Sequence, residues 1–213
     1  MAFGAIKRKV AKSTKPYQVV IGTTPPPSYL RPLKQPLYDT MQYPAAGVNA
    51  LSFFQVPQGQ ALVAGVNKTA VHTNLTQAGQ LGTPQQFDLF GFQCKLPVVT
   101  INADWDALIA NGVFTFSFGQ NRQWLTVPLA YVPAGISKDG YAATTVGATT
   151  IESHHNGQGL ISNYLNFTVG NNPIRIHSNE SFNVTLTWPT VIPTPTVAVN
   201  ITVYLLGILY SGL

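Results

Sequence analysis

The feature that most constrains the fold is a period-two alternation of apolar and polar residues, which recurs from about residue 48 onward. Alternation of this kind places one face of a strand in a core and the other in a polar environment. Turn residues such as Asn156-Gly157 separate the alternating stretches. About eight strands at this spacing predict an all-β fold, a β-sandwich or jelly roll. The clearest stretches are 114–118, 125–131, 165–169, 182–188 and 197–203.

One segment departs from the alternation and predicts a short helix over residues 102–112. Trp105, Leu108 and Ile109 fall on one side of this helix, and Asn-Gly can end it. Asp104 and Asp106 form a close pair of carboxylates, but a catalytic pair would need a cleft and a substrate between them. Helix capping and the helix dipole account for both acids in a first turn. No internal repeat suggests a second sandwich, so we expect a single jelly roll.

Charge is scarce in this chain and unevenly placed. Only 9% of the residues are charged, where an ordinary soluble domain carries roughly 25%. Residues 1–34 hold seven basic residues and no acid, whereas the rest of the chain holds five basic residues against seven acids. We therefore predict two parts, an extended N-terminal arm over 1–47 and a nearly neutral jelly-roll domain over 48–213.

The arm itself has two parts of different composition. Residues 1–15 are polar and basic, whereas residues 16–47 are rich in proline, including Pro25-Pro26-Pro27, with Tyr17 and Tyr29 among the interspersed tyrosines. Proline removes backbone donors and favours extended conformations, so we expect this segment to run over a surface. That surface can belong to its own domain or to a neighbouring subunit.

The basic cluster of the arm is the strongest candidate for a functional site. Cations near phosphates release condensed counterions, which gives a salt-dependent attraction to nucleic acid without sequence preference. The same cluster could sit on an anionic membrane surface, or it could be a solvated tail that aids solubility. The candidate residues are Lys7, Arg8, Lys9, Lys12 and Lys15.

Constellations that would support catalysis or cofactor binding are weak. Cys94 is the single cysteine and alternates with apolar residues, so we expect a buried, inert thiol and no intrachain disulfide. His154 and His155 could be drawn as a metal site with Glu152, but adjacent strand residues point to opposite faces, and a polar loop or subunit contact is the alternative. We predict no enzyme activity, no metal and no cofactor. The longest apolar runs are too short for a membrane span, and no secretory signal follows the basic start.

Three segments carry a resemblance to a known family, and the basic arm and the low charge agree with it. They are WLTVPLAYVPAG at 124–135, IRIHSNESFNVTL at 174–186 and VNITVYLLGILY at 199–210. The first resembles a strand-and-turn run, and the other two resemble the closing strands, of jelly-roll capsid proteins of icosahedral, lipid-containing bacteriophages. The chain is shorter than the double-jelly-roll members. The resemblance implies a structural virion protein, made in the host cytoplasm, that self-assembles into trimers or higher oligomers of an icosahedral capsid and contacts other virion proteins. It also implies that the arm faces genome or an internal lipid membrane.

Two rival hypotheses remain open. A carbohydrate- or receptor-binding β-sandwich of the spike or lectin type could use the loops near 156–159 and 170–173, but it gives no reason for the basic arm. A β-sandwich hydrolase would have to use the His154 and His155 region.

Overall fold

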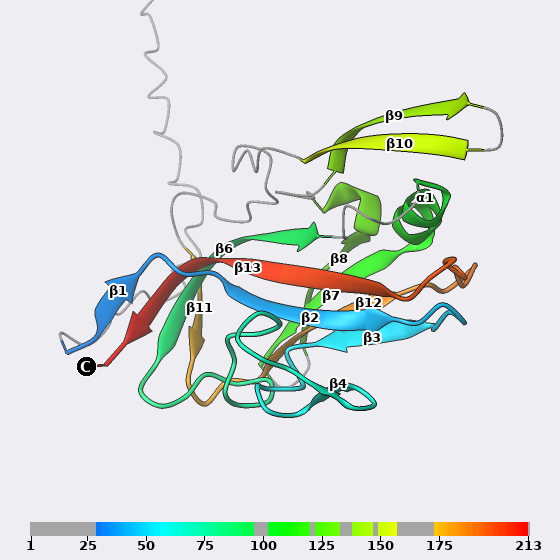
Figure 1. Cartoon of the computed structure of the whole chain (residues 1–213). Coiled ribbons are helices and arrows are strands. Elements are labelled where there is room, and N and C mark those ends of the chain that lie inside the picture. The colour runs from blue at the N-terminus through cyan, green and yellow to red at the C-terminus, as the bar shows by residue number, and fades with distance from the viewer. Residues whose placement is uncertain are drawn as a thin grey trace, which may run out of the picture.

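Two antiparallel sheets pack face to face in the computed structural model, which describes residues 29–95, 102–119, 122–132, 138–146, 149–156 and 173–212 (Figure 1). The chain is mostly β with one α-helix in the described part, so the predicted all-β sandwich is confirmed. The first sheet has the order β2-β13-β6-β11, and β1 extends the β2 edge by pairing with the far end of β13. Its strands are β1 (Arg31–Leu33), β2 (Leu37–Tyr43), β6 (Gln86–Lys95), β11 (Ile174–His177) and β13 (Val199–Ser211).

The second sheet has the order β3-β12-β7-β8. Burial alternates along β3, β12 and the first parts of β7 and β13, as the sequence pattern predicts. β6 instead has two runs of consecutive buried residues. Apolar side chains of the two sheets meet between them: the Phe92 ring lies 5.1 Å from that of Phe114 and 5.0 Å from that of Phe116, centroid to centroid. The strands are β3 (Ala50–Phe53), β7 (Val113–Phe118), β8 (Arg122–Pro128) and β12 (Phe182–Thr187).

The pairing of these strands is nested. Among the eight main strands of the described chain, taken in sequence order, the first pairs with the eighth, the second with the seventh, the third with the sixth and the fourth with the fifth. The pairs are β2–β13, β3–β12, β6–β11 and β7–β8, and all are antiparallel. This is the pattern of one long hairpin wound into two sheets, and it brings the beginning and the end of the sandwich side by side.

A helix closes one end of the sandwich, and the predicted helix is confirmed as α1 (Asn102–Asn111). Leu108 is fully buried, and its carbonyl accepts a hydrogen bond from the indole Nε1 of Trp188 at 3.0 Å. The Asp104 carboxylate accepts a hydrogen bond from the backbone N–H of Thr196 at 2.8 Å, which ties the helix to the loop before β13. The strand predicted over 125–131 ends at Pro128 and continues as a 3₁₀ turn, η1 (Leu129–Tyr131).

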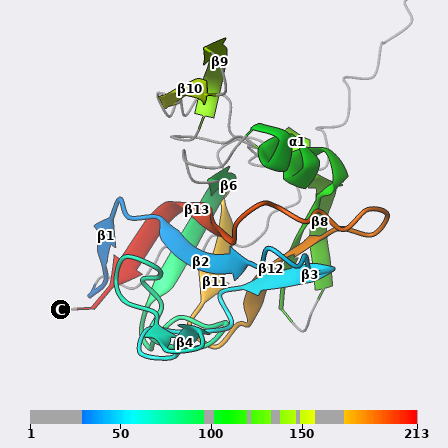
Figure 2. The same ribbon diagram turned by 45° about the vertical axis from the view of Figure 1, so that its right-hand side comes forward.

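Two hairpins lie outside the two sheets. The small one, β4 (Ala61–Val63) with β5 (Val66–Asn67), belongs to the long segment between β3 and β6. The larger one, β9 (Lys138–Val146) with β10 (Thr149–Asn156), stands away from the sheets in both Figure 1 and Figure 2. The predicted stretch 165–169 lies outside the described residues. Within the described residues, no helix is long and apolar enough to cross a membrane.

The sandwich begins earlier in the chain than the predicted boundary at residues 47 and 48. β2 is an integral strand of the first sheet, and Leu37 and Tyr43 belong to the core. The Tyr43 ring packs edge-on against Trp188 at 4.6 Å, and its hydroxyl donates to the Pro193 carbonyl at 2.8 Å. From Leu37 onward, the segment predicted to be an extended arm is thus a strand of the sandwich itself.

One glycine is required where β13 crosses the bulge against β6. A Cβ atom on Gly207 would lie 2.1 Å from the Asp88 carbonyl oxygen and 2.5 Å from Cζ of the buried Phe87. The pairing register shifts between Leu206 and Gly207, so the two backbones approach closely there.

Replacing Gly207 by alanine should therefore destabilise the fold by about 2 kcal/mol or more, because the backbone of β6 must move to make room. Urea unfolding of Gly207→Ala against wild type measures the loss. Gly82→Ala is the matched control, since its nearest neighbour would be the Gln85 side chain at an ordinary 3.6 Å. Equal unfolding midpoints for the two variants would contradict the requirement for glycine at position 207.

Candidate functional site

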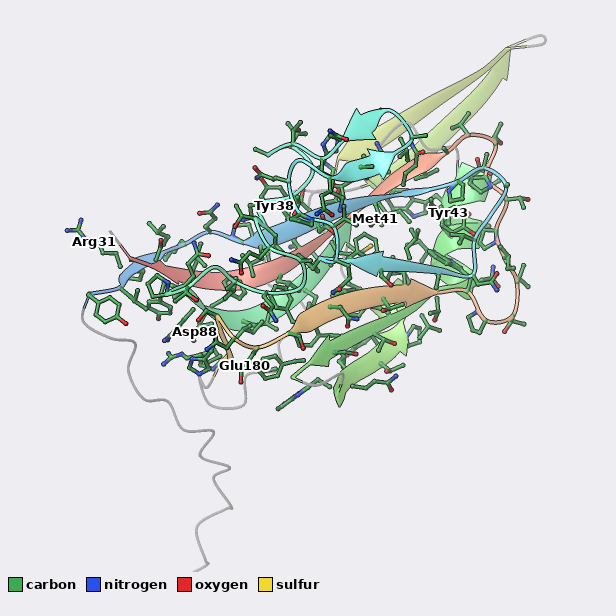
Figure 3. All side chains as sticks on the ribbon, turned by 90° about the horizontal axis from the view of Figure 1, so that it is seen from below. Arg31, Tyr38, Met41, Tyr43, Asp88 and Glu180 are labelled. Carbon is green, nitrogen blue, oxygen red and sulfur yellow. The ribbon has the colours of Figure 1, made fainter. Side chains whose placement is uncertain are left out.

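The predicted site residues Lys7, Arg8, Lys9, Lys12 and Lys15 lie outside the described residues. The described chain begins at Tyr29, at the end of the first sheet where β1 and the C-terminal end of β13 pair. Figure 3 shows Arg31 at this end of the first sheet and Tyr43 near the other end. An open cleft of about 620 Å³ lies here, lined by residues that include Tyr29, Arg31, Pro84 and Gly212.

The outer face of the second sheet carries no charged residue among the described positions. We call this surface the hydroxyl face. Its residues alternate with the buried positions of the four strands and are mostly small hydroxyl and amide side chains. They are Ala50, Ser52, Val113, Thr115, Ser117, Gln123, Thr126, Pro128, Asn183, Thr185 and Thr187.

The hydroxyl face is polar without being ionic. Thr115 and Thr126 bring their hydroxyl oxygens within 3.4 Å of each other across two strands. A depression of about 90 Å³ at one end is lined by Gln55, Ser117 and Asn183, among others. Within the described structure the buried Oδ1 of Asn183 has no hydrogen-bond partner. An uncharged face of this kind can be covered at a low desolvation cost, because no ion has to leave water.

The outer face of the first sheet has a different character. Tyr38 and Tyr204 lie side by side with ring centroids 6.0 Å apart. Arg175 binds the Asp88 carboxylate through two hydrogen bonds of 2.7 and 2.8 Å and lies over the Tyr210 ring at 5.7 Å. The bond to Asp88 raises the pKa of Arg175, and burial, together with Asp88, raises the pKa of Tyr210. The Asp88–Arg175 pair neutralises two of the charges on this face.

The β8 edge of the second sheet is protected against strand addition. β8 starts at Arg122, carries a register shift next to Trp124 and ends at Pro128. A charge, a bulge and a proline are the devices by which natural sheets prevent edge-to-edge pairing.

A buried ion pair lies on the inner side of β2. Asp39 and Lys68 both have fully buried side chains, and Nζ of Lys68 lies 2.6 Å from Oδ1 of Asp39. The other carboxylate oxygen, Oδ2, accepts a hydrogen bond of 2.6 Å from the backbone N–H of Phe54. Burial raises the pKa of Asp39, and the hydrogen bond and charge of Lys68 offset that rise only in part.

The residues tested for catalysis and metal binding are dispersed. Asp104 binds the backbone of Thr196, as described above. His154 and His155 lie on β10 in register with Tyr141 and Gly140 of β9. The ring of His72 is hydrogen-bonded to the backbone N–H of Thr69. Across the described residues, no group of three or more His, Cys, Asp or Glu side chains could hold a metal ion.

Comparisons with family models, with curated proteins and with solved structures find no match to this chain.

Sequence reasoning missed two of these features. The hydroxyl face had a visible signal, because the polar positions of the strands 113–118 and 182–187 are Ser, Thr or Asn throughout, apart from the terminal Val113. The Asp39–Lys68 pair had none, since the two residues belong to different segments that only the folded chain brings together.

Cys94 lies buried in β6, where burial raises the pKa of its thiol to about 12. Because the thiolate is the reactive form, the folded protein should not react with a thiol reagent at pH 8. The same reagent should modify one thiol per chain in guanidinium chloride. Absorbance at the wavelength of the released chromophore measures both reactions. Rapid labelling of the folded protein would contradict the burial of this thiol.

Proposed function

We propose that this chain is a structural virion protein, a single-jelly-roll capsid subunit that assembles with copies of itself into an icosahedral shell. The nested pairing of the eight main strands supports the jelly-roll assignment, since two Greek-key halves of four strands produce this order. Fold alone does not define function, so the proposal depends on the surfaces of the sandwich and on the arm.

The observation that carries the proposal is the charge-free hydroxyl face. A monomer in solution gains solubility from charged surface residues, and this sheet face has none among its described positions. Interface cores between subunits are depleted in charge. A face that is polar and uncharged suits a contact that is repeated many times in a shell.

The distribution of charge supports the same proposal. The first 34 residues hold seven basic residues and no acid. In the sandwich, Asp39 with Lys68 and Asp88 with Arg175 neutralise each other. The arm can then attract a polyanion, the genome or an anionic internal membrane, while the domains pack without long-range repulsion.

A charge placed on the hydroxyl face should prevent assembly without unfolding the subunit. Thr185 lies on the central strand β12, opposite Thr115 and Ser52. We expect Thr185→Lys to raise the concentration needed for assembly by about tenfold or more, roughly 1.4 kcal/mol per contact. Light scattering and negative-stain microscopy measure assembly, and thermal unfolding checks the fold.

Ala64→Lys, an exposed change in the β4–β5 turn, is the matched control and should assemble like wild type. Identical particles from both variants would reject the role of the hydroxyl face. A wild-type protein that stays monomeric at all concentrations would reject the capsid proposal itself.

Deletion of residues 2–15 should spare folding and weaken binding to nucleic acid or to anionic vesicles. Each lost phosphate contact lowers the slope of log K against log salt by about 0.9 for duplex DNA. Titrations of fluorescent DNA and of vesicles at several salt concentrations, with and without the deletion, separate the two partners. An unchanged salt response for both would show that the cluster is only a solvated tail.

A carbohydrate- or receptor-binding role is the second candidate. The specific observation in its favour is the polar depression beside Asn183, where an unpaired amide oxygen and the Ser117 hydroxyl lie together. Saccharide binding by a stable low-order oligomer would favour this role over the capsid.

A further inference from the structure

The buried pair of Asp39 and Lys68 is a reactive combination that capsid assembly does not require. A primary amine and a carboxyl group lie with Nζ and Oδ1 2.6 Å apart, and both side chains are fully excluded from solvent. Asp39 belongs to β2, and Lys68 follows β5 in the chain segment that connects β3 to β6. Any bond between them would close a loop through the part of the chain that contains β3, β4 and β5.

The ionic form of this pair is poorly solvated on the lysine side. An ammonium group carries three donors, and among the described residues its one hydrogen-bond acceptor is Asp39. Two buried ions recover their desolvation cost only if the remaining donors and acceptors are also satisfied. Burial raises the pKa of Asp39, which favours the protonated acid at the 2.6 Å contact with Nζ of Lys68.

The carboxyl group is held in the geometry that acyl transfer needs. The backbone N–H of Phe54 donates to Oδ2 at 2.6 Å, so the oxygen that gains negative charge in a tetrahedral intermediate already has a donor. Phe54, which donates this N–H, has a φ of 66°, an uncommon backbone conformation for a residue other than glycine.

We propose that Lys68 and Asp39 form an intramolecular isopeptide bond. One proton passes from the Lys68 ammonium to the Asp39 carboxylate, the lone pair of Nζ then attacks Cγ, and the negative charge develops on Oδ2 beside the Phe54 N–H. The Nζ–Cγ bond forms and the Cγ–Oδ1 bond breaks. Oδ1 leaves as water with two of the three ammonium protons, and the third remains on the amide nitrogen. No oxidant, cofactor or second substrate enters the balance.

The fixed contact between Nζ and Oδ1 raises the rate of bond formation. Holding two reacting groups together in a dry site replaces a bimolecular encounter by a unimolecular step of high effective molarity. Exclusion of solvent also removes the water that would reverse the reaction. The product links β2, at the edge of the first sheet, to the segment between β3 and β6. The bond stabilises the fold because it closes a loop and so lowers the conformational entropy of the unfolded chain.

The mass of the purified full-length protein tests the inference directly, whether or not the protein assembles. We expect the folded wild-type chain to be lighter than its sequence mass by one water molecule. A modified Lys68 is no longer cut by trypsin, so the linked chain should yield one peptide spanning 35–95, also lighter by one water. An unlinked chain yields the separate peptides 35–68 and 69–95.

Lys68→Arg is the control, because it keeps the positive charge but should not form this bond, so its mass should equal its sequence mass. A wild-type chain of full mass that trypsin cuts after Lys68, even after long incubation of the folded protein, would overturn the inference. So would a water loss that maps to Asp139-Gly140, where an aspartate can cyclise onto its own backbone, instead of to 35–95. Since the measurement uses wild-type protein, a variant that fails to fold does not affect it.

Discussion

The rest of the structure depends on the double pairing of β13. One edge of this strand pairs with β2 and β1, from the beginning of the described chain, and the other edge pairs with β6. Its buried positions from Val199 to Leu205 alternate strictly, so a shift of one residue would turn the whole core face outward. The close approach at Gly207 fixes the register against β6. Both sheets are positioned by this constraint, because the strands of the second sheet pair inside the hairpin that β2 and β13 close.

Two ion pairs, Asp39 with Lys68 and Asp88 with Arg175, neutralise charge within the sandwich. Asp39 lies on the core side of β2 and is tolerated there because Lys68 and the Phe54 N–H satisfy it. Asp88 and Arg175 neutralise each other across β6 and β11 on the opposite side of the sheet. The second sheet is left with mostly hydroxyl and amide side chains on its outer face, together with a few small apolar residues such as Ala50. The two outer faces can therefore serve different contacts.

Much of the fold could be predicted from the pattern of residues. The strands at 113–118 and 182–187 and the helix at 102–111 follow directly from their periodicities, and the burial of Cys94 follows from its apolar neighbours. β2 was missed because Asp39 occupies a core position in a proline-rich segment, where the sequence reads as a surface strand. Its burial depends on a lysine 29 residues away, which no local pattern contains.

Some features of the candidate site could likewise be predicted from the sequence, and others could not. By itself the sequence determined the charge separation between arm and domain, the alternation of the strands and the uncharged polar positions along them, because each of these is a property of neighbouring residues. Only the tertiary structure decided that these polar positions form one continuous face, that the sandwich starts at Leu37 and that an amine and a carboxyl group meet in the core. Those features depend on pairings between distant segments, which are set by the packing of the whole chain and not by local propensity.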